Sequence, residues 1–417
     1  MRPDARIQAA IDILTALETT DQPADRLIRD HFRKRRYAGS KDRAAVAERV
    51  FQVLRHSVSL AWTMQDDSPR ALVLAAVARG GEDPDTLFTG QQHAPAPLTE
   101  AEHKQLKSAA TETPLHVEGE FPAFLEPELA RAFGDRVLRE MSAFPGRAPT
   151  DLRANALKAA RDEVLRTLKE QGYDAAPTPH SPVGIRIASG GAGLDRTPAF
   201  ESGLFEFQDE AAQIASILVA PQPGERILDL AAGAGGKSLA LAALSNNEAT
   251  IVATDIRAAA LEQLRLRAER AGAQVGIRPD PQGPFDAVLL DAPCTGTGTW
   301  RRQPELRGRL TASLLAKRIA VQDELLDSAA RFVKPGGRLI YATCSILPSE
   351  NQERIAAFRA RHPHFVLHSA ATIWSRATGA QPPPGMAEDF RATPYATGTD
   401  GFYCAILRCE PEKGAKA

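Results

Sequence analysis

Cysteine is scarce in this sequence. Its 417 residues include four, at positions 294, 344, 404 and 409, all in the last third of the chain. Such a distribution excludes the disulfide framework of a small secreted domain and predicts a reducing, cytoplasmic environment. Long hydrophobic runs are also missing, because no stretch approaches the ~18 residues that a membrane span needs. The N-terminal MRPDARIQAA lacks the apolar segment of a signal peptide, so we expect no membrane association.

Net charge is nearly absent as well. The chain has 51 Lys and Arg against 52 Asp and Glu, and 43% of its residues are hydrophobic. This composition excludes a disordered chain, which combines low hydrophobicity with high net charge. The length predicts roughly two to four domains. Taken alone, the charge balance argues against a polyanionic partner, but charges can be segregated along a chain.

Residues 1–115 show only helical patterns, and their charge is unbalanced. The stretch 26–55 holds ten Lys and Arg against three acids, a net of +7. A solvated helix face and a nucleic-acid contact both explain such a run. The basic tetrapeptide at 33–36, between Phe32 and Tyr37, favours the nucleic-acid hypothesis. The candidate contacts are Arg33, Lys34, Arg35 and Arg36.

A small α/β module is predicted over residues 119–203, after a polar, proline-containing stretch at 90–104. The segment FPAFLEPELARAFG predicts a helix that ends near Gly134. The segments TDLRANALK and VGIRIAS predict strands on either side of the helix DEVLRTLKEQG, a β-α-β-like arrangement.

From residue 204 onward, strands and helices alternate. This rhythm predicts an α/β fold with a mostly parallel, doubly wound, Rossmann-like sheet. Its expected strands are 226–231, 250–255, 285–291 and 337–343, and its expected helices are 236–245, 257–271 and 316–333. Asp229, Asp255 and Asp291 fall in or near the ends of three of these strands. Ligands bind at the carboxyl ends of such strands, so the three carboxylates are expected to share one crevice.

The glycine-rich segment LDLAAGAGGKS, residues 228–238, joins a strand to a helix. Small residues there let the backbone approach a ligand, and the helix N-terminus offers unpaired N–H groups. Its glycines fit neither GxxxxGK[ST] nor GxGxxG, which excludes the common phosphate-binding turns. Asp255, placed to accept hydrogen bonds from two ribose hydroxyls, favours a nucleoside without a pyrophosphate, most commonly S-adenosylmethionine. A structural turn, and a helix N-cap at Asp255, remain open alternatives.

A second segment, DAPCTGTGTWRRQPE at 291–305, combines a carboxylate, a thiol, an aromatic ring and two cations. Packing alone does not readily explain Asp291, Cys294 and Trp300 in this order. Residues 300–318 hold six Lys and Arg against one acid, and the cations next to Trp300, Arg301 and Arg302, are further candidate nucleic-acid contacts.

The third segment is YATCSILPSENQE, residues 341–353. It places Cys344 at the end of a strand, at the same sheet edge as Cys294. A lone cysteine is usually a small buried hydrophobe, the interpretation we favour for Cys404 and Cys409. Two cysteines beside a predicted nucleoside site favour chemistry instead. Neither CxxC nor His–Cys ligand spacing accompanies them, so we expect no metal.

The motifs DAPCTGTG, ATCSILPSENQE and TDGFYCA (399–405) together resemble the RsmB and Sun-type family of RNA cytosine-5 methyltransferases, over about residues 119–409. The segment DRAAVAERVFQVLRH is similar to the NusB-like RNA-binding domain of that family. The resemblance implies a NusB-like region at 1–115, a pre-catalytic module at 119–203 and a class I methyltransferase domain at 204–417.

The resemblance also implies roles for individual residues. Cys344 would be the nucleophile, Cys294 would assist product release, and Asp291 would contact the base. The implied S-adenosylmethionine site comprises Ala231, Ala232, Gly233, Ala234, Gly235, Gly236, Lys237, Asp255, Asp280 and Asp291. The family usually has CAAPGGK where this chain has AAGAGGK. This departure leaves the rigidity of the turn and the cofactor affinity in doubt.

The implied substrate is ribosomal RNA, with transfer RNA as the less favoured choice, and no obligate protein partner is evident. Two other classes stay open. One is an RNA-binding ribosome-assembly factor in which catalysis is dispensable. The other is a methyltransferase for proteins or small molecules, against which the basic stretches argue.

Overall fold

The structure is a computed structural model that describes residues 1–35, 37–108, 112–188 and 191–411. The chain divides into two compact units. Unit 1 comprises Met1–Arg147 and Thr299–Leu310, and unit 2 comprises Ala148–Gly298 and Thr311–Ala417. Unit 1 therefore extends past residue 115, the predicted end of the helical region, and takes up a second segment from late in the sequence.

Unit 1 is helical in its described residues, as the sequence pattern predicts. Apolar residues at helical spacing, such as Ile13, Val50 and Leu74, form its core. The last of its longer helices ends at Gly134, whose positive φ of 55° stops the helix where expected. The helices are α1 Pro3–Glu18, α2 Ala24–Arg33, α3 Ser40–Arg55, α4 Ser57–Met64, α5 Pro69–Arg79, α6 Pro84–Leu87, α7 Glu100–Leu106, α8 Leu115–Glu118, α9 Glu126–Phe133 and α10 Val137–Met141.

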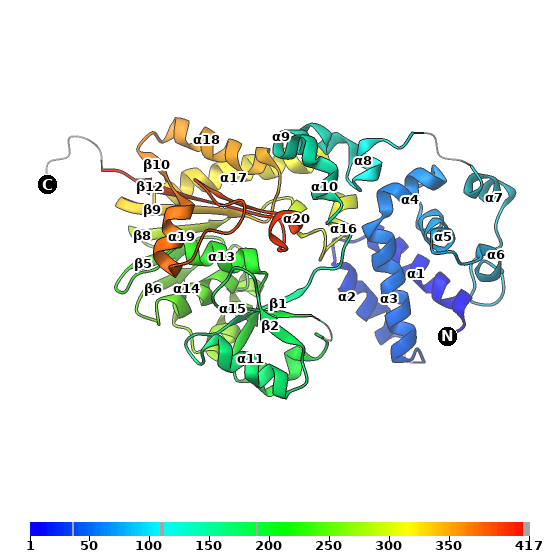
Figure 1. The fold of residues 1–417 in the computed structure, drawn as a ribbon, viewed down its shortest axis with the longest axis horizontal. Helices are drawn as coiled ribbons and strands as arrows, with labels where there is room; N and C mark the ends of the chain where they lie inside the picture. The colour runs from blue at the N-terminus through cyan, green and yellow to red at the C-terminus, as the bar shows by residue number, and fades with distance from the viewer. Residues whose placement is uncertain (36, 109–111, 189–190, 412–417) are drawn as a thin grey trace. The chain divides into compact units, whose positions relative to one another are not determined.

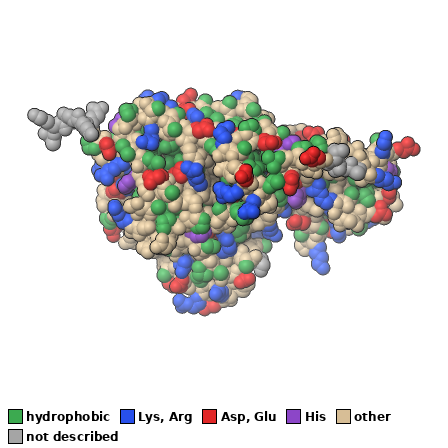
Figure 2. Space-filling model, turned by 45° about the horizontal axis from the view of Figure 1, so that its top comes forward, with side chains coloured by type: hydrophobic (Ala, Val, Ile, Leu, Met, Phe, Trp, Pro, Cys, Tyr) green, Lys and Arg blue, Asp and Glu red, His purple; other side chains and the backbone are tan. Residues whose placement is uncertain are grey.

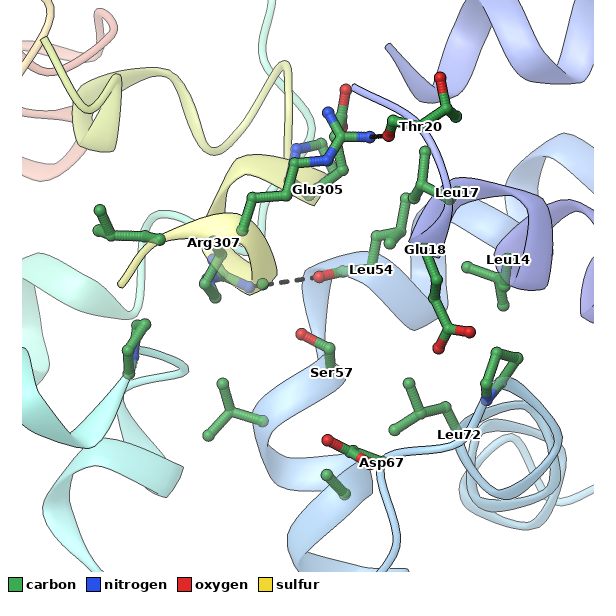
Figure 3. A pocket seen from close by; sticks show the side chains of 18 of the residues that line it. Leu14, Leu17, Glu18, Thr20, Leu54, Ser57, Asp67, Leu72, Glu305 and Arg307 are labelled. Carbon is green, nitrogen blue, oxygen red and sulfur yellow. Dashed lines mark hydrogen bonds between the residues drawn. The ribbon is translucent and has the colours of Figure 1, made fainter. Parts of the chain in front are cut away.

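The segment 299–310 lies within unit 1 and includes α16, Glu305–Arg309. Arg307 is almost fully buried, and its Nη1 donates a hydrogen bond to the carbonyl oxygen of Arg55 over 2.6 Å. A carboxylate oxygen of Glu305 accepts from the backbone N–H of Ala24 over 3.1 Å. Beside α16 is a cavity of about 910 Å³, lined by apolar side chains such as Leu54 and Leu72 and by polar ones such as Glu18 (Figure 3).

Unit 2 begins with a four-stranded sheet whose order is β2-β3-β1-β4. The predicted strands and helix are present, but β1 and β3 pair antiparallel. Two further strands of three residues each, β2 and β4, complete the sheet. The elements are β1 Thr150–Ala154, α11 Arg161–Glu170, β2 Ala175–Pro177, β3 Gly184–Ile187, α12 Pro198–Glu201 and β4 Phe205–Phe207.

The larger sheet of unit 2 contains eight strands among the described residues. Strands β9, β8, β5, β6 and β7 are parallel neighbours in that order, and β12 joins β9 antiparallel. The strands are β5 Arg226–Asp229, β6 Thr250–Ala253, β7 Val275–Ile277, β8 Phe285–Asp291, β9 Val333–Thr343, β10 Phe365–His368, β11 Phe390–Ala392 and β12 Phe402–Cys409. This arrangement confirms the predicted mostly parallel, doubly wound sheet.

Helices cover both faces of this sheet (Figure 1). Ile227 and Leu289 face the side of α13, α14 and α19, whereas Leu228 and Val288 face α17 and α18. Burial on both faces explains why these strands read as continuous apolar runs. The helices are α13 Glu210–Leu218, α14 Gly236–Leu244, α15 Ala258–Ala271, α17 Ala312–Ala330, α18 Gln352–Arg361, α19 Ala370–Thr378 and α20 Pro394–Thr397.

Acidic and basic side chains are interspersed over the face that Figure 2 shows, in keeping with 51 positive against 52 negative residues. Within the described part of the chain, no helix is both long and apolar enough to cross a membrane.

Candidate active site

The carboxyl ends of the parallel strands bring the predicted acids and cysteines to one edge of the large sheet. Asp229 ends β5, Asp291 ends β8, and Cys344 follows the last residue of β9. The register places Asp229 beside Leu289 and Asp291 beside Ala342. This shared edge is the crevice that the strand pattern predicts.

The glycine-rich turn depends on its glycines. Gly233 and Gly235 have φ angles of +55° and +82°, values that residues other than glycine rarely adopt. A Cβ atom on Gly235 would lie 2.5 Å from Cγ of Leu264. The carboxylate of Asp255 accepts a hydrogen bond from the backbone N–H of Gly233 over 2.8 Å, which ties the turn to the end of β6.

Two buried arginine contacts brace the same turn. Nη1 of Arg267, on α15, donates to the carbonyl of Ala234 over 2.7 Å, and Arg153, on β1, donates to the carbonyl of Gly236 over 2.7 Å. Glu206 on β4 holds Arg267 through an ion pair of 2.9 Å. These contacts fix the turn where the family sequence would have the rigid Ala-Pro pair. Sequence reasoning missed them because the arginines come from elements remote in the chain.

The predicted ribose-binding carboxylate has a cationic neighbour. Arg257 forms a two-pronged contact with Asp255, with Nε 2.9 Å from Oδ1 and Nη2 3.0 Å from Oδ2. These hydrogen bonds are the main reason why the pKa of Asp255 lies below its ordinary value. Asp280, the less certain cofactor acid of the prediction, is exposed after β7 and accepts from Gln282 over 2.9 Å.

Lys237 and Asp291 form an ion pair in the crevice, with Nζ 2.5 Å from Oδ2. Burial opposes the charge of Lys237, but Asp291 outweighs burial, and with help from Asp229 and Cys344 it raises the lysine pKa above its ordinary value. The ammonium group also lies 5.1 Å from the ring centre of Phe402. The cation of this ion pair also interacts with Cys344, the predicted nucleophile.

Asp229 is a deeply buried acid at the end of β5. Its Oδ2 accepts from the hydroxyl of Ser238 over 2.6 Å, and among the described residues its Oδ1 has no hydrogen-bond partner. Burial is the largest effect on its pKa, and raises it to about 7 although the Ser238 hydrogen bond opposes the rise.

The two predicted catalytic cysteines face each other. Both are free and half-buried, and their Sγ atoms lie 3.3 Å apart. The hydrogen bond to Cys344 is the largest of the effects that raise the pKa of Cys294 well above its ordinary value, and burial adds to it. Cys404 and Cys409 are buried in β12, as a structural role requires.

The predicted nucleic-acid contacts differ in exposure. Arg33 and Lys34 are exposed, and Arg35 is half-buried with Nη1 3.3 Å from the carbonyl of His31. Arg36 lies outside the described residues.

The second predicted contact region needs a correction. Arg302 is exposed, but Arg301 is buried, and Trp300 is fully buried in unit 1. The ring of Trp300 lies 6.1 Å from that of Phe144, and Arg307 lies over it at 5.0 Å. Packing therefore does explain Trp300, contrary to the interpretation of the sequence, and the exposed position at this point belongs to Arg302.

A buried polar network beside the cysteines was not predicted. Glu350 is fully buried and accepts hydrogen bonds from Thr295 and Ser345, the residues that directly follow the two cysteines. Thr297 contacts Ser345 over 3.0 Å between their hydroxyl oxygens. The sequence signal was one acid within the polar stretch SENQE, residues 349–353. The burial of Glu350 and its hydrogen-bond partners, which indicate its role, become visible only in the fold.

These groups can perform nucleophilic chemistry on a planar, polar substrate. A thiol supplies the nucleophile, the carboxylate of Asp291 can accept a hydrogen bond, and a backbone turn with an acid at the next strand can hold a nucleoside. Among the described residues, no cluster of three or more His, Cys, Asp or Glu side chains could hold a metal ion.

Comparison with known proteins identifies the family. Residues 216–408 match 16S rRNA methyltransferase RsmB/F, and residues 121–192 match the ferredoxin-like domain of RsmF/B-like methyltransferases. Ribosomal RNA small subunit methyltransferase B of Klebsiella pneumoniae (strain 342) is 35% identical over 295 residues, covering 69% of this chain and 65% of that protein. The chain thus spans less than two thirds of that relative's length. The protein of the same name from Sodalis glossinidius (strain morsitans) is 34% identical over 328 residues, covering 76% and 70%.

Solved structures share the fold. PH0851 superposes with a TM-score of 0.77 at 27% identity, over 99% of both chains. A methyltransferase homologue from Pyrococcus horikoshii gives 0.60 at 25% identity, over 70% of this chain and 97% of its own. NSun6 from Pyrococcus horikoshii, solved with SFG, gives 0.60 at 20% identity, over 70% of this chain and 99% of its own, and shows the fold alone. With the matched domains and the coverage of the Sodalis relative, the chain belongs to the RsmB/F methyltransferase family.

Proposed function

We propose that this protein is an S-adenosylmethionine-dependent RNA cytosine-5 methyltransferase that acts on ribosomal RNA through a covalent cysteine adduct. Membership of the RsmB/F family supports methyl transfer to ribosomal RNA. The observation that carries the covalent mechanism is the pair of free thiols, 3.3 Å apart, at the sheet edge that also holds the Lys237–Asp291 ion pair.

The residues of the crevice fit S-adenosylmethionine. The backbone of the glycine turn and the carboxylate of Asp255 are joined by the hydrogen bond from Gly233, and both are groups of the kind that bind a nucleoside. The unpartnered Oδ1 of the buried Asp229 offers a further acceptor at the same edge. When bound, this cofactor supplies an electrophilic methyl group on a sulfonium centre. Arg257 has to release Asp255, at least in part, when the ribose binds.

Cys344 is the proposed nucleophile. Carbon 5 of cytosine is a weak nucleophile, but addition of a thiolate to carbon 6 converts the ring into an enamine that is reactive at carbon 5. This attack requires a thiolate, and Lys237, which is paired with Asp291, is the cation that interacts with Cys344. Asp291, held by Lys237, is placed to hydrogen-bond the pyrimidine near N3 and so to stabilise the adduct.

Cys294 is proposed to promote release of the product. After methylation, the proton on carbon 5 must leave before the thioether to Cys344 can break. The free Cys294 thiol is a poor base, because its hydrogen bond with Cys344 raises its pKa. Once the sulfur of Cys344 is bonded to the substrate, it can no longer carry a negative charge, so its Coulombic opposition to the Cys294 thiolate is removed. The Cys294 thiol then becomes easier to ionise at the step that needs a base.

The target base must leave its stack to reach the crevice, which favours single-stranded or flippable RNA. The basic stretch 26–55 is the proposed electrostatic contact. The two free thiols also require a reducing compartment, which supports the predicted cytoplasmic location.

The test uses three cysteine variants, small-subunit ribosomal RNA and tritiated S-adenosylmethionine. We expect Cys344→Ala to abolish methyl transfer and Cys294→Ala to accumulate an RNA–protein adduct on a denaturing gel. Cys409→Ala, in β12, is the control and should retain activity. Full turnover by Cys344→Ala contradicts the mechanism. Methylation of transfer RNA in place of ribosomal RNA contradicts the substrate, and bisulfite sequencing of RNA from a deletion strain with complementation identifies the base.

A further inference from the structure

Glu350 occupies an unusual place for an acid. It ends the short 3₁₀ turn Pro348–Glu350 and has no exposed surface. Burying a carboxylate costs free energy unless hydrogen bonds compensate for the lost water. A fully buried acid six residues after Cys344 therefore requires partners that hold it there.

Those partners come from both cysteine-bearing loops. Oε1 of Glu350 accepts from the backbone N–H of Thr295 over 2.9 Å and from Nε2 of Gln322 over 3.0 Å. Oε2 accepts from the hydroxyl of Thr295 and from the hydroxyl of Ser345, each over 2.5 Å. One carboxylate thus joins the residue after Cys294 to the residue after Cys344.

Backbone contacts around Gly298 also hold the two loops close together. The backbone N–H of Gly298 donates to the carbonyl of Cys344 over 2.9 Å, and that of Gly401 donates to the carbonyl of Gly298 over 2.8 Å. A Cβ atom on Gly298 would lie 2.0 Å from the carbonyl oxygen of Gly401. The two loops therefore fit together in one register, and Glu350 is the charged group within their joint.

We propose that Glu350 is a positioning residue for the proposed methyl transfer: its carboxylate locks the two cysteine loops together, and its charge disfavours the thiolate form of Cys294. The inference rests on the proposed function for its catalytic consequence only. The arrangement of the thiols and their ionisation are properties of the protein without RNA.

Several groups act on the ionisation of Cys294. Cys344 and Glu350 disfavour its thiolate, burial adds to that, and the backbone at Gly296 opposes it. Tyr341, whose hydroxyl donates to the carbonyl of Glu350 over 2.6 Å, is buried and has a raised pKa, so it supplies no charge at neutral pH. The nearby cation, Lys237, interacts with Cys344. The negative charge of Glu350 thus acts on Cys294, whereas Lys237, which is paired with Asp291, acts on Cys344.

Two substitutions separate position from charge. In Glu350→Gln the amide oxygen can accept the two N–H donors at Oε1, while the hydroxyls of Thr295 and Ser345 can rotate to accept from the amide nitrogen. This variant keeps the joint and loses the charge. Glu350→Ala loses both. Glu353→Gln, which changes an exposed acid at the start of the following helix α18, is the matched control.

The first measurement needs no RNA. The protein is alkylated with iodoacetamide across a pH series, and the peptides with Cys294 and Cys344 are quantified by mass spectrometry. We expect Glu350→Gln to lower the midpoint for Cys294 by on the order of one pH unit, the size that loss of a nearby like charge produces. Glu353→Gln should leave it in place. An unchanged midpoint in a folded Glu350→Gln protein overturns the charge role, whatever the enzyme methylates.

The second measurement is turnover on small-subunit ribosomal RNA. We expect Glu350→Ala to lower kcat at least tenfold with little change in KM, because the thiols lose their alignment while the RNA contacts remain. Ser345→Ala removes one hydrogen bond of the joint and should lower kcat less, which keeps the test decisive if Glu350→Ala does not fold. Unchanged kcat in both variants overturns the positioning role. If the wild-type protein methylates no RNA, the proposed function is contradicted instead. The alkylation experiment then still tests whether Glu350 affects the ionisation of Cys294.

Discussion

Asp229 links the protonation of the crevice to the stability of unit 2. Burial raises the pKa of its carboxyl to about 7 from an ordinary value of 3.8. The unfolded chain ionises this group at the ordinary value, so the folded state holds the proton more tightly. The stabilisation from Asp229 is therefore fully present below about pH 3.8, declines as the pH rises, and is lost above about pH 7. A pKa shift of about three units corresponds to about 4 kcal/mol in total, of which about 3 kcal/mol falls between about pH 5 and about pH 8.

Asp229→Asn removes this ionisation, since the amide stays neutral. Between about pH 5 and about pH 8, we expect the free energy of unfolding to fall by about 2–3 kcal/mol more in the parent protein than in Asp229→Asn. The assay is guanidinium unfolding followed by the fluorescence of Trp374, which is buried in unit 2. Trp62 and Trp300, the tryptophans of unit 1, are replaced by Phe in both proteins.

A second variant tests the cause. Ser238→Ala removes the hydrogen bond that favours the charged form, so the decline in stability should extend to higher pH. Parallel curves for the parent protein and Asp229→Asn would refute the reasoning, because they would mean that the carboxyl ionises alike in the folded and unfolded states. A decline that ends at lower pH in Ser238→Ala would refute the assigned role of the hydroxyl.

Three further substitutions test the crevice, with binding measured by calorimetry. Arg267→Ala removes a hydrogen bond to the glycine turn and should weaken S-adenosylmethionine binding about tenfold, which is the effect of losing one hydrogen bond to a charged group. Arg265→Ala, on the exposed side of the same helix, is the control and should leave binding unchanged. Arg257→Ala frees the ribose-facing carboxylate and should tighten binding; weaker binding would mean that the arginine itself contacts the cofactor. Gly298→Ala places a Cβ against backbone and should cost about 1–3 kcal/mol of stability and most of the turnover, whereas Gly308→Ala, where the added atom meets nothing within 4 Å, should cost little of either.

The large sheet was predictable because its strands are buried on both faces. β8 spans Phe285–Asp291, the same residues that the apolar run predicts, and an acid marks its end. Parallel topology then brings the ends of β5, β8 and β9 to one edge. Cys294 and Cys344 could be assigned to one site for this reason, fifty residues apart in sequence, before any contact was known.

The small sheet and the braces of the turn were not predictable in the same way. β2 and β4 have three residues each, too few for an alternating pattern to stand out. Arg153 and Arg267 act through single carbonyl contacts that leave no periodic signal. A side chain that braces a turn from a distant element is recognisable only once the fold has brought the two together.

Trp300 shows why sequence order misleads about function. It follows Cys294 by six residues, so a linear reading assigns its ring to the chemistry of that loop. The chain leaves unit 2 after Gly298 and returns at Thr311, and in between Trp300 is fully buried in the core of unit 1. A tryptophan that stacks on a base and a tryptophan that packs in a core look the same in the sequence, because burial of apolar area is favourable in both environments. The buried fraction of the side chain distinguishes these two roles. That fraction depends on the unit into which residues 299–310 fold, and this is a property of the whole fold.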